Sequence, residues 1–422
     1  MNLVKLGEIC DFYNGGAWKQ SEFAETGYPV LKVSNCKNSG FEIDDVSFIP
    51  YEIAQKSENN KLYIGDVIIA TVGSHPNLIE SAAGRSCIVT KKVQGFYLNQ
   101  NAVCLRSKNC DILDQRYLGY LAASAPFKHY IQSCGKGAAN QMRIAIGAIK
   151  EYEFLLPDIQ IQRKIGATLA AYDDLIENNQ KQIKLLEEAA QRLYKEWFVD
   201  LRFPGHETAP IADGVPEGWQ RKTVAECLSF HGNGGWGKET PMGKNEHPGK
   251  VIRGTDIEDI KAGRFNDVPL RYHTDNDIKK RTLKNYDLVF ELSNGNINNI
   301  GRCLLVDDLV LKNCGENTIC ASFCKLLRPA DRVHSLVLYW EIQDMQTSGR
   351  MLPYKKHGAN GINNFDFDGF LNHELLIPNN ADMLTPIEAI MAKISIIQGQ
   401  FALLTEARDR LLPKLMNGEI EV

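Results

Sequence analysis

The clearest candidate for chemistry in this sequence is a glycine-rich segment that ends in a lysine. Residues 232–238 read Gly-Asn-Gly-Gly-Trp-Gly-Lys and fit both Gly-x-Gly-x-x-Gly and Gly-x-x-x-x-Gly-Lys, two patterns of phosphate-binding loops. Such loops hold phosphate at the N-terminus of the helix that follows them. Here Glu239 replaces the Ser or Thr that would hold magnesium, and Pro241 disfavours a helix. We therefore interpret the segment as a loop that faces a ligand through its backbone, Trp or Lys, with a nucleotide-driven enzyme as the alternative.

No other pattern in the sequence is typical of a catalytic or metal site. The nine histidines form neither His-x-x-x-His nor His-Glu-x-x-His, and there is no Gly-x-Ser-x-Gly. The Asn-Pro-Pro-Phe/Tyr and Asp-Pro-Pro-Tyr motifs that hold a flipped base for methylation are also missing. Eleven cysteines without a Cys-x-x-Cys pair favour reduced, mostly buried thiols in the cytoplasm, with metal binding as the minor alternative. We predict a chain that is not an enzyme and has no cofactor or metal of its own.

Polar loops recur at matched places, and their side chains could contact DNA. Asn, Gln, Arg, Lys and Ser hydrogen-bond to base edges and phosphates, although surface loops are polar in most proteins. In the first half of the chain these candidates are Ser74, Arg85, Lys136, Asn140, Gln141 and Arg143. In the second half they are Asn296, Arg302, Lys355, Lys356 and Asn360.

These loops recur because the sequence is internally duplicated. Val30–Asn35 lies 221 positions before Val251–Asp256, and Glu153–Pro157 lies 221 positions before Glu374–Pro378. A helical segment follows each copy. At 422 residues the chain is too long for one core. We predict an α/β (α+β) protein with two mixed domains, residues 1–157 and 204–378, and two helical segments, residues 158–203 and 379–422.

Charge is distributed unevenly between these parts. Residues 1–157 carry 16 Lys and Arg against 15 Asp and Glu, and residues 219–378 carry 21 against 20, so each domain has a net charge of +1. The whole chain has a net charge of −4, which places the acidity in the helices and linkers. Domains that are so nearly neutral should hold phosphate only modestly by themselves. No apolar run approaches the roughly 18 residues of a membrane span, and we expect no membrane partner.

Both helical segments have apolar residues at alternating spacings of four and three, which is the period of a coiled-coil seam. The first seam consists of Ile165, Leu169, Tyr172, Ile176, Asn179, Ile183, Leu186, Leu193 and Trp197. The second consists of Ile387, Ile390, Ile394, Ile397, Phe401, Leu404, Leu411 and Leu415. We predict that the two helices form an antiparallel pair with approximate two-fold symmetry, in which the polar Asn179 fixes the register. The alternative is that each stripe packs on its own domain.

At this point the sequence resembles the specificity subunit of type I restriction–modification systems over essentially the whole chain. The resemblance is carried by Leu175–Asn179, Leu185–Glu188, Leu193–Phe198, Arg202–His206, Val215–Trp219 and Arg408–Gly418. It implies two target recognition domains that each read one half of a bipartite site in double-stranded DNA. It also implies that the helices set the gap between the half-sites and dock two methyltransferase subunits, and that restriction/motor subunits, which combine nuclease and motor, join for cleavage. S-adenosylmethionine, ATP and magnesium are then expected on the partner subunits.

The resemblance adds candidate DNA contacts from the glycine-rich loops and from the segments 32–35 and 253–256. These are Asn14, Lys19, Lys32, Ser34, Asn35, Asn233, Lys238, Arg253 and Thr255. Lys32 and Asn35 depart from the more family-like Arg253 and Asp256 of the second copy. A coiled-coil scaffold for proteins alone, without sequence-specific DNA binding, is kept as the alternative function.

Overall fold

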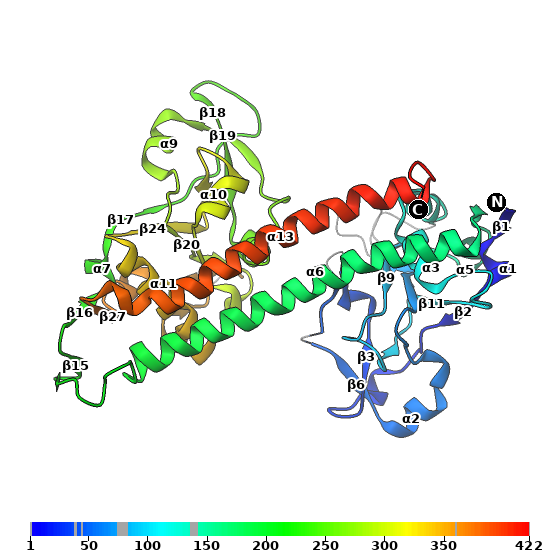
Figure 1. Cartoon of the computed structure of the whole chain (residues 1–422), viewed down its shortest axis with the longest axis horizontal. Coiled ribbons are helices and arrows are strands. Elements are labelled where there is room, and N and C mark those ends of the chain that lie inside the picture. Colours follow the sequence, from blue (N-terminus) through cyan, green and yellow to red (C-terminus); the bar gives the residue numbers. More distant parts are fainter. Residues whose placement is uncertain are drawn as a thin grey trace. The chain divides into compact units, whose positions relative to one another are not determined.

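The computed structural model describes residues 2–37, 40–43, 45–73, 83–135, 142–358 and 361–421 (Figure 1). The chain divides into two compact units. Unit 1 comprises Met1–Asp174 with Thr405–Val422, and unit 2 comprises Leu175–Leu404. Both units mix helices and strands, and two long helices each contribute residues to both, so the predicted fold class is confirmed.

Unit 1 is built around a four-stranded antiparallel sheet. Its order is β2 (Cys10–Asn14), β11 (Ala102–Ser107), β7 (Val67–Ala70), β9 (Ser86–Ile88). A three-stranded sheet has the order β10 (Tyr97–Leu98), β3 (Tyr28–Leu31), β6 (Ser47–Ile49). Three two-stranded pairs are β1 (Asn2–Lys5) with β13 (Glu153–Leu156), β8 (Val72–Gly73) with β12 (Met142–Arg143), and β4 (Cys36–Lys37) with β5 (Gly40–Phe41). The short helices are α1 (Leu6–Ile9), α2 (Tyr51–Lys56), α3 (Gln115–Ala123), α4 (Ala125–Ser133) and α5 (Ile146–Lys150).

Unit 2 repeats this arrangement. Its four-stranded sheet has the order β17 (Leu228–Asn233), β24 (Cys324–Pro329), β20 (Leu288–Glu291), β22 (Cys303–Leu305). The smaller sheets are β19 (Leu270–Thr274), β18 (Asn245–Ile252), β23 (Ile319–Cys320); β21 (Ser293–Asn294), β26 (Asn363–Phe365), β25 (Lys355–Lys356); β16 (Trp219–Thr223) with β27 (Glu374–Pro378); and β14 (Ile211–Ala212) with β15 (Val215–Pro216). Its helices are α7 (Val224–Cys227), α8 (Ile257–Lys261), α9 (Asp275–Arg281), α10 (Asp308–Cys314), α11 (Arg332–Ser348) and α12 (Phe367–Phe370).

The duplication extends to strand register and to the core. Val30 of β3 lies parallel and opposite to Tyr97 of β10, as Val251 of β18 does to Ile319 of β23. The four residues of β7 are all buried: Val67 and Ile69 belong to one apolar cluster, and Ile68 between them belongs to another. Such apolar strands are typical of a sheet that is covered on both faces.

A buried ion pair recurs at the start of the central strand in each unit. Asp66 precedes β7 and accepts from the Nε and Nη2 of Arg106 at 2.8 and 2.7 Å. Asp287 precedes β20 and accepts from the same atoms of Arg328 at 2.8 and 2.6 Å. In each case two strands that are distant in sequence are tied together by a bidentate contact, which supports a common origin for the two units.

The long helices are α6 (Ile159–Tyr194, 36 residues) and α13 (Thr385–Met416, 32 residues). A π-helical turn, Lys195–Val199, extends α6, and α13 continues through Pro413 for one more turn. Within unit 1, Arg408 of α13 donates to Asp173 of α6 at 2.9 Å. Within unit 2, Ile183 of α6 clusters with Ile397 of α13, although Ile397 precedes Arg408. The two helices therefore run antiparallel along their pairing.

The apolar stripes of these helices contact different partners along their length. Ile165 and Leu169 belong to the core of unit 1, with Leu411, Leu412 and Leu415 of α13. In unit 2 a separate helix–helix cluster contains Ile183, Leu186, Ile390, Ile394 and Ile397. Leu193, Trp197 and Ile387 pack with the core of unit 2. Each stripe therefore packs on a domain core over part of its length and on the other helix over another part, so each of the two interpretations holds for part of the helices.

The other stripe positions are buried or half-buried: Tyr172, Ile176, Asn179, Phe401 and Leu404. Asn179 is buried, and its Nδ2 has no hydrogen-bond partner within the described residues. A buried amide nitrogen that makes no hydrogen bond costs stability; that Asn179 fixes the register stays a prediction.

The composition of α13 qualifies the expectation that no segment of the chain could span a membrane. The sequence has no unbroken apolar run of span length, but the segment Ala381–Met416 is long and apolar enough, by length and composition, to cross a bilayer. That test is weak for a single helix, and its buried residues Ile387, Ile394 and Ile397 belong to the clusters described above.

Candidate nucleic-acid interface

The glycine-rich loops of both units dock in the same way. In unit 1, Gly15 N donates to Ala102 O at 3.0 Å and Gly16 N donates to Leu98 O at 2.8 Å. In unit 2, Gly234 N donates to Cys324 O at 3.0 Å and Gly235 N to Cys320 O at 2.9 Å. A Cβ atom on Gly15 or Gly234 would lie 1.8 or 2.1 Å from a backbone oxygen. These glycines are therefore required because two backbones approach closely.

The polar residues beside these glycines project outward. Asn14, Lys19, Asn233 and Lys238 are all exposed, so they remain available to a ligand. The next regular element after Lys238 is strand β18, so the helix that a phosphate-binding loop needs does not follow. The segment therefore lacks the following helix on which a phosphate-binding loop depends.

Each unit presents a capped 3₁₀ turn beside its glycine-rich loop, at Val33–Asn35 and Gly254–Asp256. Asn35 Oδ1 accepts from Lys32 N at 2.9 Å, and Asp256 Oδ2 accepts from Arg253 N at 2.8 Å. The departure at Asn35 thus keeps the same capping role. Its Nδ2 also donates to Glu42 O at 2.9 Å, so this buried side chain is already used inside the protein.

The residues that surround each cap divide into exposed and engaged side chains. Ser34 and Thr255 occupy the middle of the two turns and are exposed. Lys32 Nζ donates to Ser47 Oγ at 2.7 Å. Arg253 pairs with the capping carboxylate of Asp256 and donates to Asp267 O at 2.9 Å. Ser34 and Thr255 are thus the members of these turns with the freest access to a ligand.

An arginine connects each turn to the loop after the central strand. Arg85 Nη1 donates to Cys36 O at 2.5 Å, and Arg302 Nη2 donates to Gly254 O at 2.9 Å. The backbones around them also match, because Gly84 N donates to Ala70 O and Gly301 N donates to Glu291 O. The structure therefore brings the turn, the arginine and the end of the central strand together in both units.

Unit 2 adds a polar hairpin to this group. Lys355 Nζ donates to Asn298 O at 3.3 Å and to Gln346 Oε1 at 3.0 Å, and burial lowers the pKa of Lys355. Lys356 is exposed and forms a 2.7 Å ion pair with Asp366. The exposed Asn296 accepts from Asn298 N at 3.0 Å. These contacts place the three predicted residues of this loop and hairpin on one polar surface.

Sequence reasoning missed several residues of this surface. Asn363 Nδ2 donates to Gly295 O at 2.9 Å, and Ser293 Oγ donates to Asn364 Oδ1 at 2.6 Å. Glu291 binds Arg302 from inside the unit. The adjacent Asn363 and Asn364 could have been recognised as a polar pair, but nothing in the sequence links Glu291 to Arg302.

In unit 1 a described polar candidate of this kind lies on β12. Arg143 is exposed on β12, whose neighbour Met142 pairs with Gly73 of β8. The candidates Ser74, Lys136, Asn140 and Gln141, and Asn360 of unit 2, lie outside the described residues.

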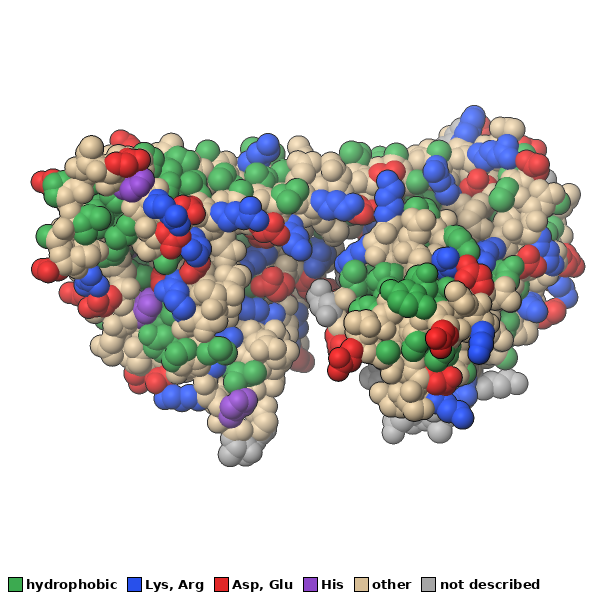
Figure 2. Space-filling model, turned by 90° about the horizontal axis from the view of Figure 1, so that it is seen from below, with side chains coloured by type: hydrophobic (Ala, Val, Ile, Leu, Met, Phe, Trp, Pro, Cys, Tyr) green, Lys and Arg blue, Asp and Glu red, His purple; other side chains and the backbone are tan. Residues whose placement is uncertain are grey.

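Charged side chains of both signs are mixed on the surface that Figure 2 shows, and most of the cysteines are buried. In the face drawn in Figure 2, Lys and Arg side chains are interspersed with Asp and Glu rather than gathered in one patch. All eleven cysteines are free thiols, and eight of them are buried. Within the described ranges, no group of three or more His, Cys, Asp or Glu side chains is placed to hold a metal ion.

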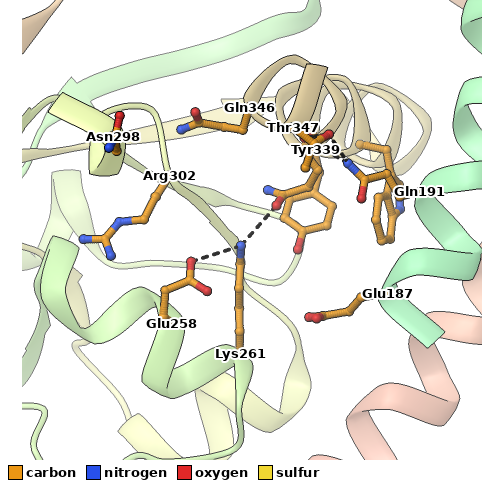
Figure 3. A pocket seen from close by; sticks show the side chains of 11 residues that line it. Glu187, Gln191, Glu258, Lys261, Asn298, Arg302, Tyr339, Gln346 and Thr347 are labelled. Carbon is orange, nitrogen blue, oxygen red and sulfur yellow. Dashed lines mark hydrogen bonds and ion pairs between the residues drawn. The ribbon is translucent and has the colours of Figure 1, made fainter. Parts of the chain in front are cut away.

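A cleft of about 330 Å³ lies in unit 2 between α6, α8 and α11 (Figure 3). Lys261 Nζ donates to Gln343 Oε1 at 3.1 Å and lies 3.6 Å from Glu258. The carboxylate of Glu187 faces this cleft, and burial raises its pKa to about 7, with Lys261 opposing the shift and Glu258 adding to it. Because two carboxylates balance Lys261 and Arg302, the lining does not favour a phosphate.

Glu187 is expected to make the protein less stable as pH rises through this range. Its pKa is raised from 4.5 to about 7, so the folded chain keeps a proton that the unfolded chain has released. Stability therefore falls between about pH 5 and 7.5. Urea unfolding of Glu187→Gln should lose this part of the pH dependence, whereas Glu188→Gln, at the next position of α6, should retain it. An unchanged slope in Glu187→Gln would contradict the assignment.

Comparison with known proteins gives consistent matches. Residues 1–188 match the family model described as type I restriction modification DNA specificity domain. The type I restriction enzyme MjaIX specificity subunit of Methanocaldococcus jannaschii is 25% identical over 323 residues, which are 72% of this chain and 69% of that protein. The EcoKI specificity subunit of Escherichia coli is 20% identical over 407 residues, which are 93% of this chain and 82% of that protein.

A solved structure with the same fold is among the matches. The type I restriction–modification S subunit from M. genitalium superimposes with a TM-score of 0.55 at 14% sequence identity. The alignment covers 98% of this chain and 95% of that one.

Proposed function

This chain belongs to the specificity subunits of type I restriction–modification systems, and from that premise we propose that it reads a bipartite DNA sequence, with one half-site for each unit. The single observation that carries the proposal is the duplicated surface. In each unit an equivalent arginine contacts an equivalent capped turn. The exposed residue of the turn is Ser34 in unit 1 and Thr255 in unit 2. A shared scaffold with different exposed side chains suits two readers of different base sequences.

We assign catalysis to partner subunits and a recognition role to this chain. Residues 1–157 and residues 219–378 each carry a net charge of only +1, which gives little affinity for a duplex by counterion release alone. Two methyltransferase subunits that close around the DNA would supply the missing phosphate contacts. They would carry S-adenosylmethionine, and the restriction/motor subunits would carry ATP and magnesium, in a cytoplasmic complex.

The long helices offer an attachment surface for the methyltransferases. In unit 2 their outer faces expose large apolar side chains: Leu175, Leu185, Ile396 and Leu403, which are 50% to 69% exposed. Exposed apolar side chains mark a protein–protein contact where they gather in one patch. We propose that the methyltransferases cover these residues.

Replacing residues 1–157 with the equivalent domain of a relative that has another target should change one half-site only. The boundary follows β13, which pairs with β1 near the N-terminus, so the graft keeps this strand pair together and leaves α6 intact. Because each unit has its own core, its reading should not depend on the other. Methylome sequencing of cells that carry the chimera and its methyltransferase gives both half-sites directly.

The reciprocal graft of residues 219–378 is the matched control and should change the other half-site. If either graft altered both half-sites, the two-reader assignment would be wrong. If the natural complex methylated DNA without sequence preference, the scaffold alternative would be favoured.

A further inference from the structure

We propose that Glu291 is a positioning residue that holds the reading surface of unit 2 in one fixed arrangement, at a position where unit 1 has Ala70. The inference rests on the proposed function and names the group that makes one of the two readers rigid. Glu291 is the last residue of β20, and its side chain is 2% exposed, so it cannot contact DNA itself.

The carboxylate of Glu291 binds two polar groups that lie on either side of it. Its Oε2 accepts from Arg302 Nε at 2.7 Å, and its Oε1 accepts from Asn294 Nδ2 at 2.7 Å. Asn294 Oδ1 in turn accepts from Asn296 N at 2.7 Å. One buried carboxylate therefore orients the loop that carries the exposed Asn296.

The same carboxylate also fixes the 3₁₀ turn. Arg302 uses its Nη2 to donate to Gly254 O at 2.9 Å, so the guanidinium bridges Glu291 and the turn. A Cβ atom on Gly254 would lie 2.0 Å from Glu291 Oε1. The turn thus packs directly on the carboxylate, and Thr255, the next residue, is exposed. The turn and the loop are two separate elements that share one internal anchor.

A shared anchor of this kind matters for base recognition. Hydrogen bonds to base edges discriminate only when the donor and acceptor are held within about 0.5 Å of the required geometry by packing and by supporting hydrogen bonds. A buried carboxylate with charge-assisted bonds on both oxygens provides such support. If it is neutralised, Thr255 and Asn296 should remain on the surface but sample more positions relative to each other.

Unit 1 has no carboxylate at this position. Ala70 makes the backbone contact with Arg85 that Glu291 makes with Arg302, because Ala70 N donates to Arg85 O and Glu291 N donates to Arg302 O, each at 2.9 Å. Val33 begins the turn where unit 2 has Gly254. The two half-sites should therefore respond differently to the loss of this carboxylate.

The test is Glu291→Gln in the assembled methyltransferase complex. Affinity is measured on the natural duplex and on duplexes with one substituted base pair in either half-site, after the grafts described above have assigned the half-sites. One good base contact discriminates by about tenfold or more. We expect discrimination at the half-site of unit 2 to fall about tenfold, with discrimination at the other half-site unchanged.

Asp287→Asn is the matched control. Asp287 is also 2% exposed and forms the Arg328 ion pair, but at the start of β20 instead of its end. Both variants should lower the unfolding temperature, and only Glu291→Gln should lose discrimination. Arg302→Lys, which keeps the charge but cannot bridge Glu291 and Gly254, should reproduce the loss and serves if Glu291→Gln does not fold.

Equal loss of discrimination in Asp287→Asn would overturn the inference, as would a general loss of affinity in Glu291→Gln with discrimination intact. Either result leaves the proposed function standing. A natural complex that discriminates at neither half-site would refute the proposed function instead.

Discussion

Ile183→Asp is expected to abolish both assembly with the methyltransferase subunits and DNA modification. Ile183 is 4% exposed in the cluster that α6 forms with Ile394 and Ile397 of α13. An aspartate there would bury a charge among apolar side chains at a cost of several kcal/mol. Because a typical domain is stable by only about 5–15 kcal/mol, the helix pair should separate. Co-purification with the methyltransferase and methylome sequencing measure the two effects.

Lys184→Asp is the control for this substitution, since Lys184 is exposed on the next position of the same helix. It introduces the same side chain and a larger change in charge, yet it should leave assembly intact. A stable and active complex that contains Ile183→Asp would show that the pairing of α6 with α13 is not needed for docking.

The long helices illustrate what the sequence predicts well. The spacing of four and three from Ile165 to Trp197 predicts a helix, and α6 extends over Ile159–Tyr194. The same spacing cannot identify the partner of each residue, because a stripe that packs on a domain and a stripe that packs on a helix have the same period. Ile165 and Leu169 therefore join the core of unit 1, whereas Ile183 joins a helix–helix cluster.

Contacts between residues that are distant in sequence could not be predicted, for a related reason. The pairs Asp66–Arg106 and Asp287–Arg328 depend on which strands are neighbours and in which register. Local patterns locate strands but leave their pairing open. The internal repeat did predict that whatever arrangement one unit adopts, the other adopts too, and the matched strand orders agree with this.

The candidate site was predictable in position more than in residue roles. The repeat predicted the positions of both turns and both arginines, and within each unit the arginine contacts the turn. It could not show that Asn35 and Asp256 are buried caps, because Asn and Asp are equally suited to capping and to base recognition. Nor could it reveal Glu291, whose role arises only where β20 meets the turn at Gly254.

The second large effect concerns the gap between the half-sites. On the antiparallel pair, Ile183 clusters with Ile394 and Ile397, so Asn179, four residues earlier, is expected near Phe401. Inserting seven residues after Asn179 and seven after Gln400 therefore places two new heptads face to face. The insertion points lie between the contacts of Gln398 with Lys261 and of Arg408 with Asp173, so neither is interrupted. One heptad keeps each apolar stripe in phase.

Such a variant should recognise the same half-sites with a wider gap. Seven residues lengthen a helix by about 10 Å, close to three base-pair steps of roughly 3.4 Å. Three steps also rotate the groove by nearly a third of a turn of about 10.5 base pairs, so DNA twist should absorb part of the change. We expect the gap to grow by about one to three base pairs in methylome sequencing. Inserting the heptad in α6 alone should prevent assembly, because the seams then fall out of register. An active double insertion with an unchanged gap would mean that the helices do not set the separation.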